Sequence, residues 1–152
     1  MEVIDTKNFG AIPYLPEAVL EFPAGLPGFE QVRRFLPVRL PETEPLIFLQ
    51  SLDRPEICFI TLPAKAVDPD YRLEMTDADA ERIGFKRARR TAAAPEPLCL
   101  AIVSVKEAGP TANLLAPVVI NPANNRAVQA IAPGSDYSWE HPLEPAEAPT
   151  CS

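Results

Sequence analysis

Nineteen prolines divide this 152-residue chain into short segments. They are spread from Pro13 to Pro149. Because proline fixes its own φ and has no backbone N–H to donate, it is costly inside helices and central strands. Long helices therefore have almost no room, and short elements joined by turns are expected. The length is that of one domain, and a hydrophobic content of 47% is sufficient for its core.

The apolar runs of the chain are short and bounded by turn residues, a pattern typical of strands. Runs such as residues 46–49 and 57–60 are apolar at consecutive positions, which indicates strands covered on both faces, as in a barrel or a sandwich. Because Pro117 falls inside one run, that strand is predicted to be bulged or at an edge. We expect strands at residues 18–22, 35–40, 46–52, 57–62, 71–75, 98–105, 114–120 and 127–132, with a further strand within 3–12.

Turn residues predict how these strands are connected. Gly25 and Gly28 lie in the segment 23–28, where glycine can adopt a positive φ. Residues 53–56 fit a hairpin between two apolar strands. The sequence predicts one short helix over residues 76–84.

The helix prediction rests on its ends and on the segments around it. Thr76 can act as the N-cap, Asp77 and Asp79 favour the positive end of a helix, and Gly84 can terminate it. The later residues 86–97 are expected to form an exposed loop. We predict one domain over residues 1–143, followed by a disordered acidic, proline-rich tail at 144–152.

Composition limits the class of protein. The net charge of −7 disfavours nucleic acid as a partner and suits basic proteins, although an acidic surface can also serve solubility alone. The N-terminus is acidic where a signal peptide would be basic, and no apolar run is long enough to span a membrane. The three cysteines have no C-x-x-C spacing, and Cys58 and Cys99 sit in apolar runs as core residues would. A cytoplasmic protein without metal or cofactor is therefore expected.

Catalytic templates are absent from the sequence. It contains no phosphate-binding glycine loop and no nucleophile elbow. His141 is the single histidine, so no pair of histidines can bind a metal. The expectation is that the protein is not an enzyme. The alternative is a small hydrolase-like enzyme that uses His141 with a nearby carboxylate such as Asp136.

Two charged segments allow a functional interpretation beside a structural one. Six acids between residues 68 and 81 could form a docking patch for a basic partner, with Tyr71 as an anchor. Charge alone favours a solvated strand and helix face. The basic cluster Lys86–Arg90 could contact nucleic acid, but it has no interleaved aromatic residues, and solvation is again favoured.

Several blocks of the sequence, in order along nearly the whole chain, carry a resemblance to a known family. They are FPAGLPGFE at residues 22–30, LQSLDRP at 49–55, PDY at 69–71, TANLLAPVVIN at 111–121 and YSWEHPL at 137–143. Together they resemble the signatures of the flagellar assembly factor FliW family. Glu140 departs from that pattern, in which a basic residue usually precedes the final His-Pro-Leu.

The resemblance implies a mainly antiparallel, mixed sheet folded over into a pseudo-barrel, an all-β fold. It also implies a cytoplasmic protein that binds flagellin and, when free, binds and antagonises the RNA-binding translational regulator CsrA. We expect a monomer. Gly25 and Gly28 would serve turn geometry, and Asn113 would cap local backbone groups. The partner-binding candidates are Asp68, Asp70, Tyr71, Glu74, Asp77, Asp79, Asn113, Tyr137, Trp139 and His141.

Overall fold

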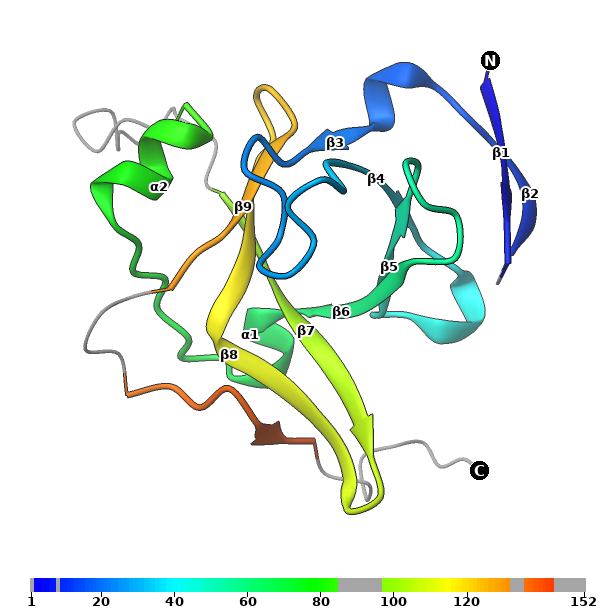
Figure 1. The fold of residues 1–152 in the computed structure, drawn as a ribbon. Helices are drawn as coiled ribbons and strands as arrows, with labels where there is room; N and C mark the ends of the chain where they lie inside the picture. The colour runs from blue at the N-terminus through cyan, green and yellow to red at the C-terminus, as the bar shows by residue number, and fades with distance from the viewer. Residues whose placement is uncertain (1, 8, 85–96, 132–135, 144–152) are drawn as a thin grey trace.

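Eight of the strands form one curved sheet (Figure 1). The computed structural model describes residues 2–7, 9–84, 97–131 and 136–143. The eight-stranded sheet has the order β10-β8-β7-β6-β5-β4-β3-β9, and β8 pairs with β9 as well. These strands are β3 (Leu20–Glu21), β4 (Arg34–Val38), β5 (Ile47–Ser51), β6 (Cys58–Pro63), β7 (Leu98–Lys106), β8 (Gly109–Asn121), β9 (Arg126–Gln129) and β10 (His141–Pro142).

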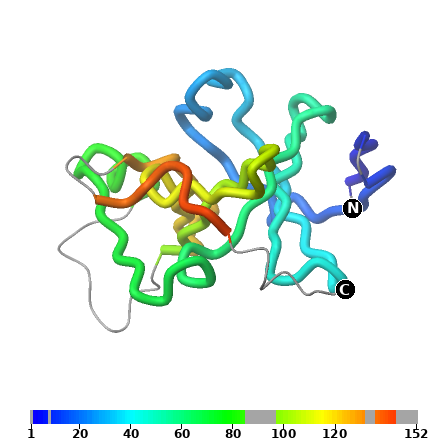
Figure 2. Tube along the Cα trace, turned by 90° about the horizontal axis from the view of Figure 1, so that it is seen from below, coloured from blue at the N-terminus to red at the C-terminus, as the bar shows by residue number. Residues whose placement is uncertain are grey.

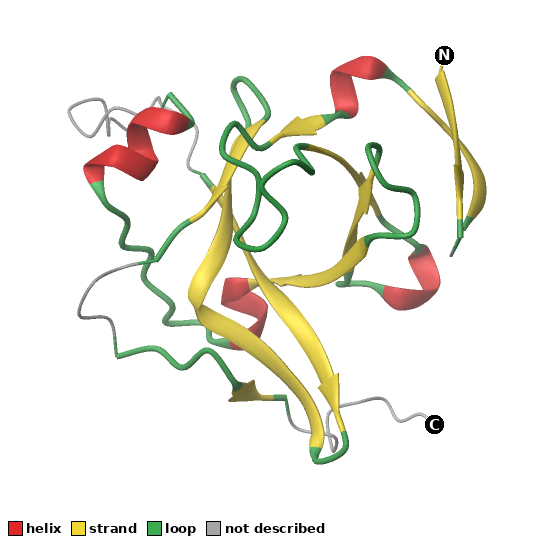
Figure 3. Cartoon of the chain, in the orientation of Figure 1, coloured by secondary structure: helices red, strands yellow, loops and turns green. Residues whose placement is uncertain are grey.

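The double pairing of β8 closes the sheet into a ring. Strand β10 alone lies outside that ring, on the free edge of the first part of β8. Neighbouring strands run antiparallel except β3 and β9, which meet in parallel at Glu21 and Arg126. The predicted mixed, mainly antiparallel pseudo-barrel is therefore confirmed, and Figure 3 shows how little of the chain is helical.

The core lies on both sides of the strands β7 and β8. Phe22 and Phe35 fill the ring interior with their rings 5.1 Å apart, and Val118 packs with them. Its neighbour Val119 faces outward into a second apolar layer with Ile83, which is fully buried. The consecutive apolar residues 118 and 119 therefore lie in a strand buried on both faces. Of the two runs that suggested this arrangement, 46–49 is buried at Ile47 and Leu49, whereas 57–60 is only half-buried.

The helices and remaining strands surround the ring. Helix α1 (Ala64–Val67) was not predicted, whereas α2 (Asp77–Arg82) was. Thr76 Oγ1 accepts the N–H of Asp79 at 3.1 Å, which confirms the predicted N-cap. Two 3-10 turns, η1 (Pro16–Ala18) and η2 (Pro41–Thr43), each begin at a proline.

Two strand predictions need correction. Residues 71–75 form no strand, because Tyr71, Leu73 and Met75 pack onto the outer face of the sheet without a ladder partner. The segment 3–12 holds two strands, β1 (Glu2–Thr6) and β2 (Gly10–Tyr14), which form a separate hairpin. Figure 2 shows this hairpin beside the ring.

Pro117 lies in a bulge of β8. The register changes between the pairs Leu100–Val118 and Ile102–Asn113, so β8 carries extra residues there. Asn113 Oδ1 accepts the backbone N–H groups of Leu115 (3.1 Å) and Ala116 (2.9 Å) within this bulge. The bulge and the capping role of Asn113 are confirmed.

Some predictions lie outside the described residues. They concern the basic cluster Lys86–Arg90, most of the loop 86–97, the tail 144–152 and Cys151. Within the part of the chain that is described, no helix has the length and apolar character needed to cross a bilayer.

Candidate functional site

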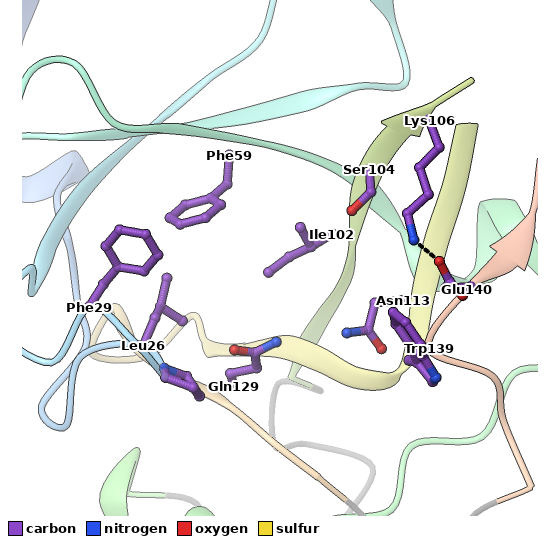
Figure 4. Close-up of a pocket in the computed structure, with 11 residues that line it drawn as sticks. Leu26, Phe29, Phe59, Ile102, Ser104, Lys106, Asn113, Gln129, Trp139 and Glu140 are labelled. Atoms are coloured by element: carbon purple, nitrogen blue, oxygen red, sulfur yellow. Dashed lines mark ion pairs between the residues drawn. The ribbon is translucent and has the colours of Figure 1, made fainter. Parts of the chain in front are cut away.

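A surface hollow of about 180 Å³ lies where the 22–32 loop approaches the β7–β8 hairpin and the C-terminal segment (Figure 4). Its walls come from segments far apart in the sequence, which the closed sheet brings together. The lining residues are Leu26, Pro27, Phe29, Phe59, Ile102, Ser104, Lys106, Asn113, Gln129, Trp139 and Glu140.

One side of the hollow is apolar. Phe29 and Phe59 meet edge to face with ring centroids 5.7 Å apart, and Leu26 and Ile102 lie beside them (Figure 4). The backbones of Leu26 and Phe29 bond to each other, which turns the loop tightly enough to bring the Phe29 ring over the sheet. Phe29 nevertheless remains 38% exposed, so part of its ring is open to a ligand.

The tight loop depends on its glycines. Gly25 and Gly28 have φ values of +67° and +83°, so their predicted role in turn geometry is confirmed. Glu30 Oε2 accepts the N–H of Gly28 at 3.0 Å, and this bond lowers the pKa of the Glu30 carboxyl. The loop is therefore held by its own backbone and by Glu30.

Two side-chain amides form a polar side of the hollow. Gln129 Nε2 donates to the carbonyl of Ala116 at 3.0 Å, while Asn113 Oδ1 caps the same bulge. Each amide therefore has one end fixed by the β8 bulge. Gln129 carried no signal in the sequence that would place it here.

An exposed aromatic and an ion pair form the rim. Trp139 is 59% exposed, and Lys106 Nζ lies 5.0 Å from the centroid of its ring. The same ammonium pairs with the carboxylate of Glu140 (Figure 4). Large exposed aromatics beside an apolar depression are typical of surfaces that bind other proteins.

Of the sequence-predicted residues, Asn113 and Trp139 line the hollow. His141 is half-buried on β10 opposite Ala112 and is not among the lining residues. The hydrolase-like alternative requires a pocket that contains both His141 and a carboxylate, and this hollow does not contain His141.

Tyr71 belongs to the core. It is 6% exposed, its hydroxyl donates to the carbonyl of Leu114 at 3.3 Å, and burial raises its pKa. Its ring lies 4.6 Å from that of Tyr137, whose hydroxyl accepts the N–H of Arg72 at 2.9 Å. In this structure Tyr71 is therefore not an exposed anchor. Instead it packs the acidic segment, residues 68–81, against the C-terminal segment, residues 136–143.

The predicted acids form a surface distinct from the hollow, whose lining includes none of them. Asp70, Glu74 and Asp77 are exposed, whereas Asp68 and Asp79 are half-buried. Asp68 Oδ1 accepts the N–H of Asp70 at 3.0 Å, and Asp79 pairs with Arg82 at 3.2 Å. The exposed carboxylates of Asp70 and Glu74 face solvent, where a partner can reach them.

The two described cysteines are half-buried thiols. Burial raises the pKa of Cys58 and of Cys99 to about 11 in each case. Thiolates are the reactive form of cysteine, so these side chains are poor nucleophiles at neutral pH. Among the described residues, no group of three His, Cys, Asp or Glu side chains could hold a metal ion.

A family model described as FliW protein matches residues 3–143. The chain belongs to the FliW family. It is 34% identical over 141 residues to the flagellar assembly factor FliW of Caldanaerobacter subterraneus subsp. tengcongensis, covering 92% of this chain and 91% of the relative. With the FliW of Thermoanaerobacter pseudethanolicus it shares 36% identity over 143 residues, again with 92% and 91% coverage.

A solved structure supports the same assignment. The crystal structure of a flagellar assembly factor FliW superposes with a TM-score of 0.81 at 29% identity, covering 96% of this chain and 99% of that one. The family and fold implied by the resemblance are therefore confirmed. The relatives are named as flagellar assembly factors and not as enzymes.

Three of the five FliW-like blocks of the sequence meet at the hollow. Leu26 and Phe29 come from the first block, Asn113 from the TANL block, and Trp139 and Glu140 from the last. The rest of the walls comes from residues outside the blocks, which nothing in their local sequence pattern set apart. They are Phe59, Ile102, Ser104, Lys106 and Gln129. This convergence makes the hollow the candidate functional site.

Proposed function

We propose that this chain acts in flagellar assembly in the cytoplasm by binding flagellin and, when free of flagellin, by binding CsrA and relieving its repression of flagellin synthesis. The observation that supports this proposal best is the convergence of three FliW-like blocks on one apolar hollow with an exposed tryptophan. A preformed hollow of this kind suits a binding protein, which needs shape and charge but no reactive group.

Competition between the two partners follows from mass action. If flagellin and CsrA cannot be held at once, the more abundant or the more tightly bound partner excludes the other. The test is isothermal titration of CsrA into the purified protein, alone and with flagellin already bound. We expect binding that disappears when flagellin is present. Failure of the protein alone to bind either partner would refute the proposal.

The acidic segment 68–81 is proposed to contribute to CsrA recognition. A protein that binds RNA must carry basic residues, and exposed acids attract it during association. Asp70→Lys combined with Asp79→Lys should slow association with CsrA and weaken its dependence on salt concentration. The measurement is the association rate at low and moderate salt.

A matched control separates local charge from net charge. Glu17→Lys with Glu42→Lys changes the net charge equally, at exposed acids outside the segment. We expect the control to keep most of the association rate. Equal slowing in both double variants would show that the segment has no special role, and unchanged rates in both would remove electrostatic steering altogether.

A further inference from the structure

We propose that strand β8 and the turn after it, residues 122–125, position the acidic segment 68–81 for CsrA, with Asn121 and Asn124 as the positioning residues. This inference rests on the proposed function, because it explains how the surface that is proposed to attract CsrA is held in place. It also gives a role to the TANLLAPVVIN block, residues 111–121, beyond its contribution to the hollow.

The acidic segment cannot fix its own position. Residues 71–75 form no strand, and helix α2 has only six residues. A helix this short is not stable by itself in water, so its position depends on contacts with the rest of the protein. From α1 to α2 the segment lies along the outer face of the sheet (Figure 1). The direction in which its carboxylates point therefore depends on how its two ends are attached.

Both ends of the segment are attached to β8. At the first end, the Tyr71 hydroxyl donates to the carbonyl of Leu114 at 3.3 Å. At the other end, Ile83, the C-cap residue of α2, is fully buried and packs with Val119. Leu114 and Val119 both belong to the TANLLAPVVIN block. One strand therefore carries the acidic segment at its beginning and at its end.

Two side-chain amides converge on the carbonyl oxygen of Ile83. Asn121 Nδ2 donates to it at 2.8 Å, and Asn124 Nδ2 donates to it at 3.0 Å. Each Oδ1 accepts a backbone N–H two residues further along the chain, so both amides are fixed at their other end as well. A carbonyl at the end of a helix has no partner within the helix, and the amides supply that partner. A Cβ on Gly84 would lie 2.9 Å from Asn124 Nδ2, which shows how closely the amide approaches the chain.

The amides act on CsrA through the carboxylates of α2, which are Asp77, Asp79 and Glu81. Thr76 Oγ1 caps the first turn of the helix, and the amides hold its last residues. Charges held in one place attract a basic partner in one orientation, whereas a frayed helix spreads the same charges over many positions. Loss of the amides should therefore slow the association of CsrA although no acid is removed.

The test removes the amide bonds and leaves the acids in place. Asn124 is exposed, so Asn124→Ala removes one bond without opening the core, and Asn121→Ala with Asn124→Ala removes both. Asn125→Gly is the matched control. Asn125 lies in the same turn with a φ of +56°, and its Nδ2 donates to the carbonyl of Glu17 at 2.7 Å. Glycine keeps this backbone conformation and removes an amide bond that does not reach α2.

The measurement is the association rate with purified CsrA, for variants that urea unfolding shows to be folded. At low salt we expect the double variant to associate about threefold to tenfold more slowly than the wild type, Asn124→Ala to lie between them, and Asn125→Gly to match the wild type. At high salt the differences should vanish, because salt screens the carboxylates. In a background with Asp77→Asn, Asp79→Asn and Glu81→Gln, loss of the amides should have no further effect.

The outcomes separate positioning from stability and from the proposed function. Slowing that persists at high salt or without the carboxylates, or that Asn125→Gly reproduces, would show that the amides only stabilise the fold, and the positioning role would be wrong. If CsrA associates equally fast with the wild type and the double variant, positioning is wrong and the proposed function stands. If the double variant does not fold, Asn124→Ala decides by the same comparisons. If the wild type binds neither CsrA nor flagellin, the proposed function itself fails.

Discussion

The glycine turn beside the hollow gives a prediction whose size follows from the structure. Gly25 and Gly28 both have a positive φ, so alanine at either position is strained by about 1–2 kcal/mol. They differ in the space around them. A Cβ on Gly25 would lie 2.6 Å from the backbone of Glu30, whereas a Cβ on Gly28 would have nothing within 4 Å. Overpacking typically adds about 1–3 kcal/mol, so Gly25→Ala should cost about 2–5 kcal/mol and Gly28→Ala about 1–2 kcal/mol.

The assay is urea unfolding of the two variants and the wild type under one set of conditions. With an m-value of about 1–3 kcal/mol/M, the midpoint of Gly25→Ala should lie roughly 1 M below that of Gly28→Ala, with m unchanged. Because the turn carries Leu26 and Phe29, Gly25→Ala should also weaken partner binding more than Gly28→Ala does. Equal midpoints would refute the reasoning, since they would mean that the close approach to Glu30 has no energetic consequence.

Two further predictions concern titratable side chains. Burial opposes ionisation of Asp53, but the backbone N–H groups of residues 33 and 34 and the Arg34 guanidinium outweigh it and lower the pKa below 3.8. Because the pKa is lower in the folded state, the ionised Asp53 stabilises the fold above about pH 4, and this effect is lost as the pH falls. Urea unfolding should therefore show that Asp53→Asn lowers the free energy of unfolding by roughly 1 kcal/mol at pH 7 and by clearly less at pH 3. An equal loss at both pH values would contradict this. The second prediction concerns Cys58 and Cys99, whose pKa values are about 11 against 9.0 for an ordinary thiol. In a Cys151→Ser variant, these two thiols should react with Ellman's reagent at pH 8 roughly 100-fold more slowly in the folded protein than after unfolding, because less of each is thiolate. A fast phase in the folded protein would show that one thiol is activated.

The strands could be predicted from the sequence where the pattern of apolar residues matches the way the strand is buried in the fold. Consecutive apolar residues predicted strands covered on both faces, and residues 118 and 119 of β8 face two different apolar layers. Residues 71–75 were wrongly predicted to form a strand, although Tyr71, Leu73 and Met75 do lie on one side of an extended segment, against the sheet. Side chains alternate between buried and exposed whenever an extended backbone lies on an apolar surface. A strand also needs a neighbouring strand to which its backbone hydrogen-bonds, and the sequence pattern carries no information about that neighbour.

The site was predictable only in part. The turn at Gly25 and the capping by Asn113 depend on nearby residues, so local reasoning could find them. The exposure of Phe29 and Trp139 depends on how residues of β6 and β7 pack against them, and such contacts across the chain leave no periodic trace in a single sequence. For the same reason, the burial of Tyr71 could not be distinguished from a surface anchor.

The parallel contact between Glu21 and Arg126 that closes the ring has a consequence for synthesis of the protein. These residues are 105 positions apart in the chain (126 − 21), so β3 leaves the ribosome long before β9 exists. At about 5–20 residues per second, roughly 5–20 s pass in that interval. During this time β3 presents an unpaired edge next to Phe22, which ends fully buried in the finished ring. A nascent chain stalled before residue 126 is therefore an open sheet with an exposed edge, a form that chaperones and proteases can distinguish from the closed protein.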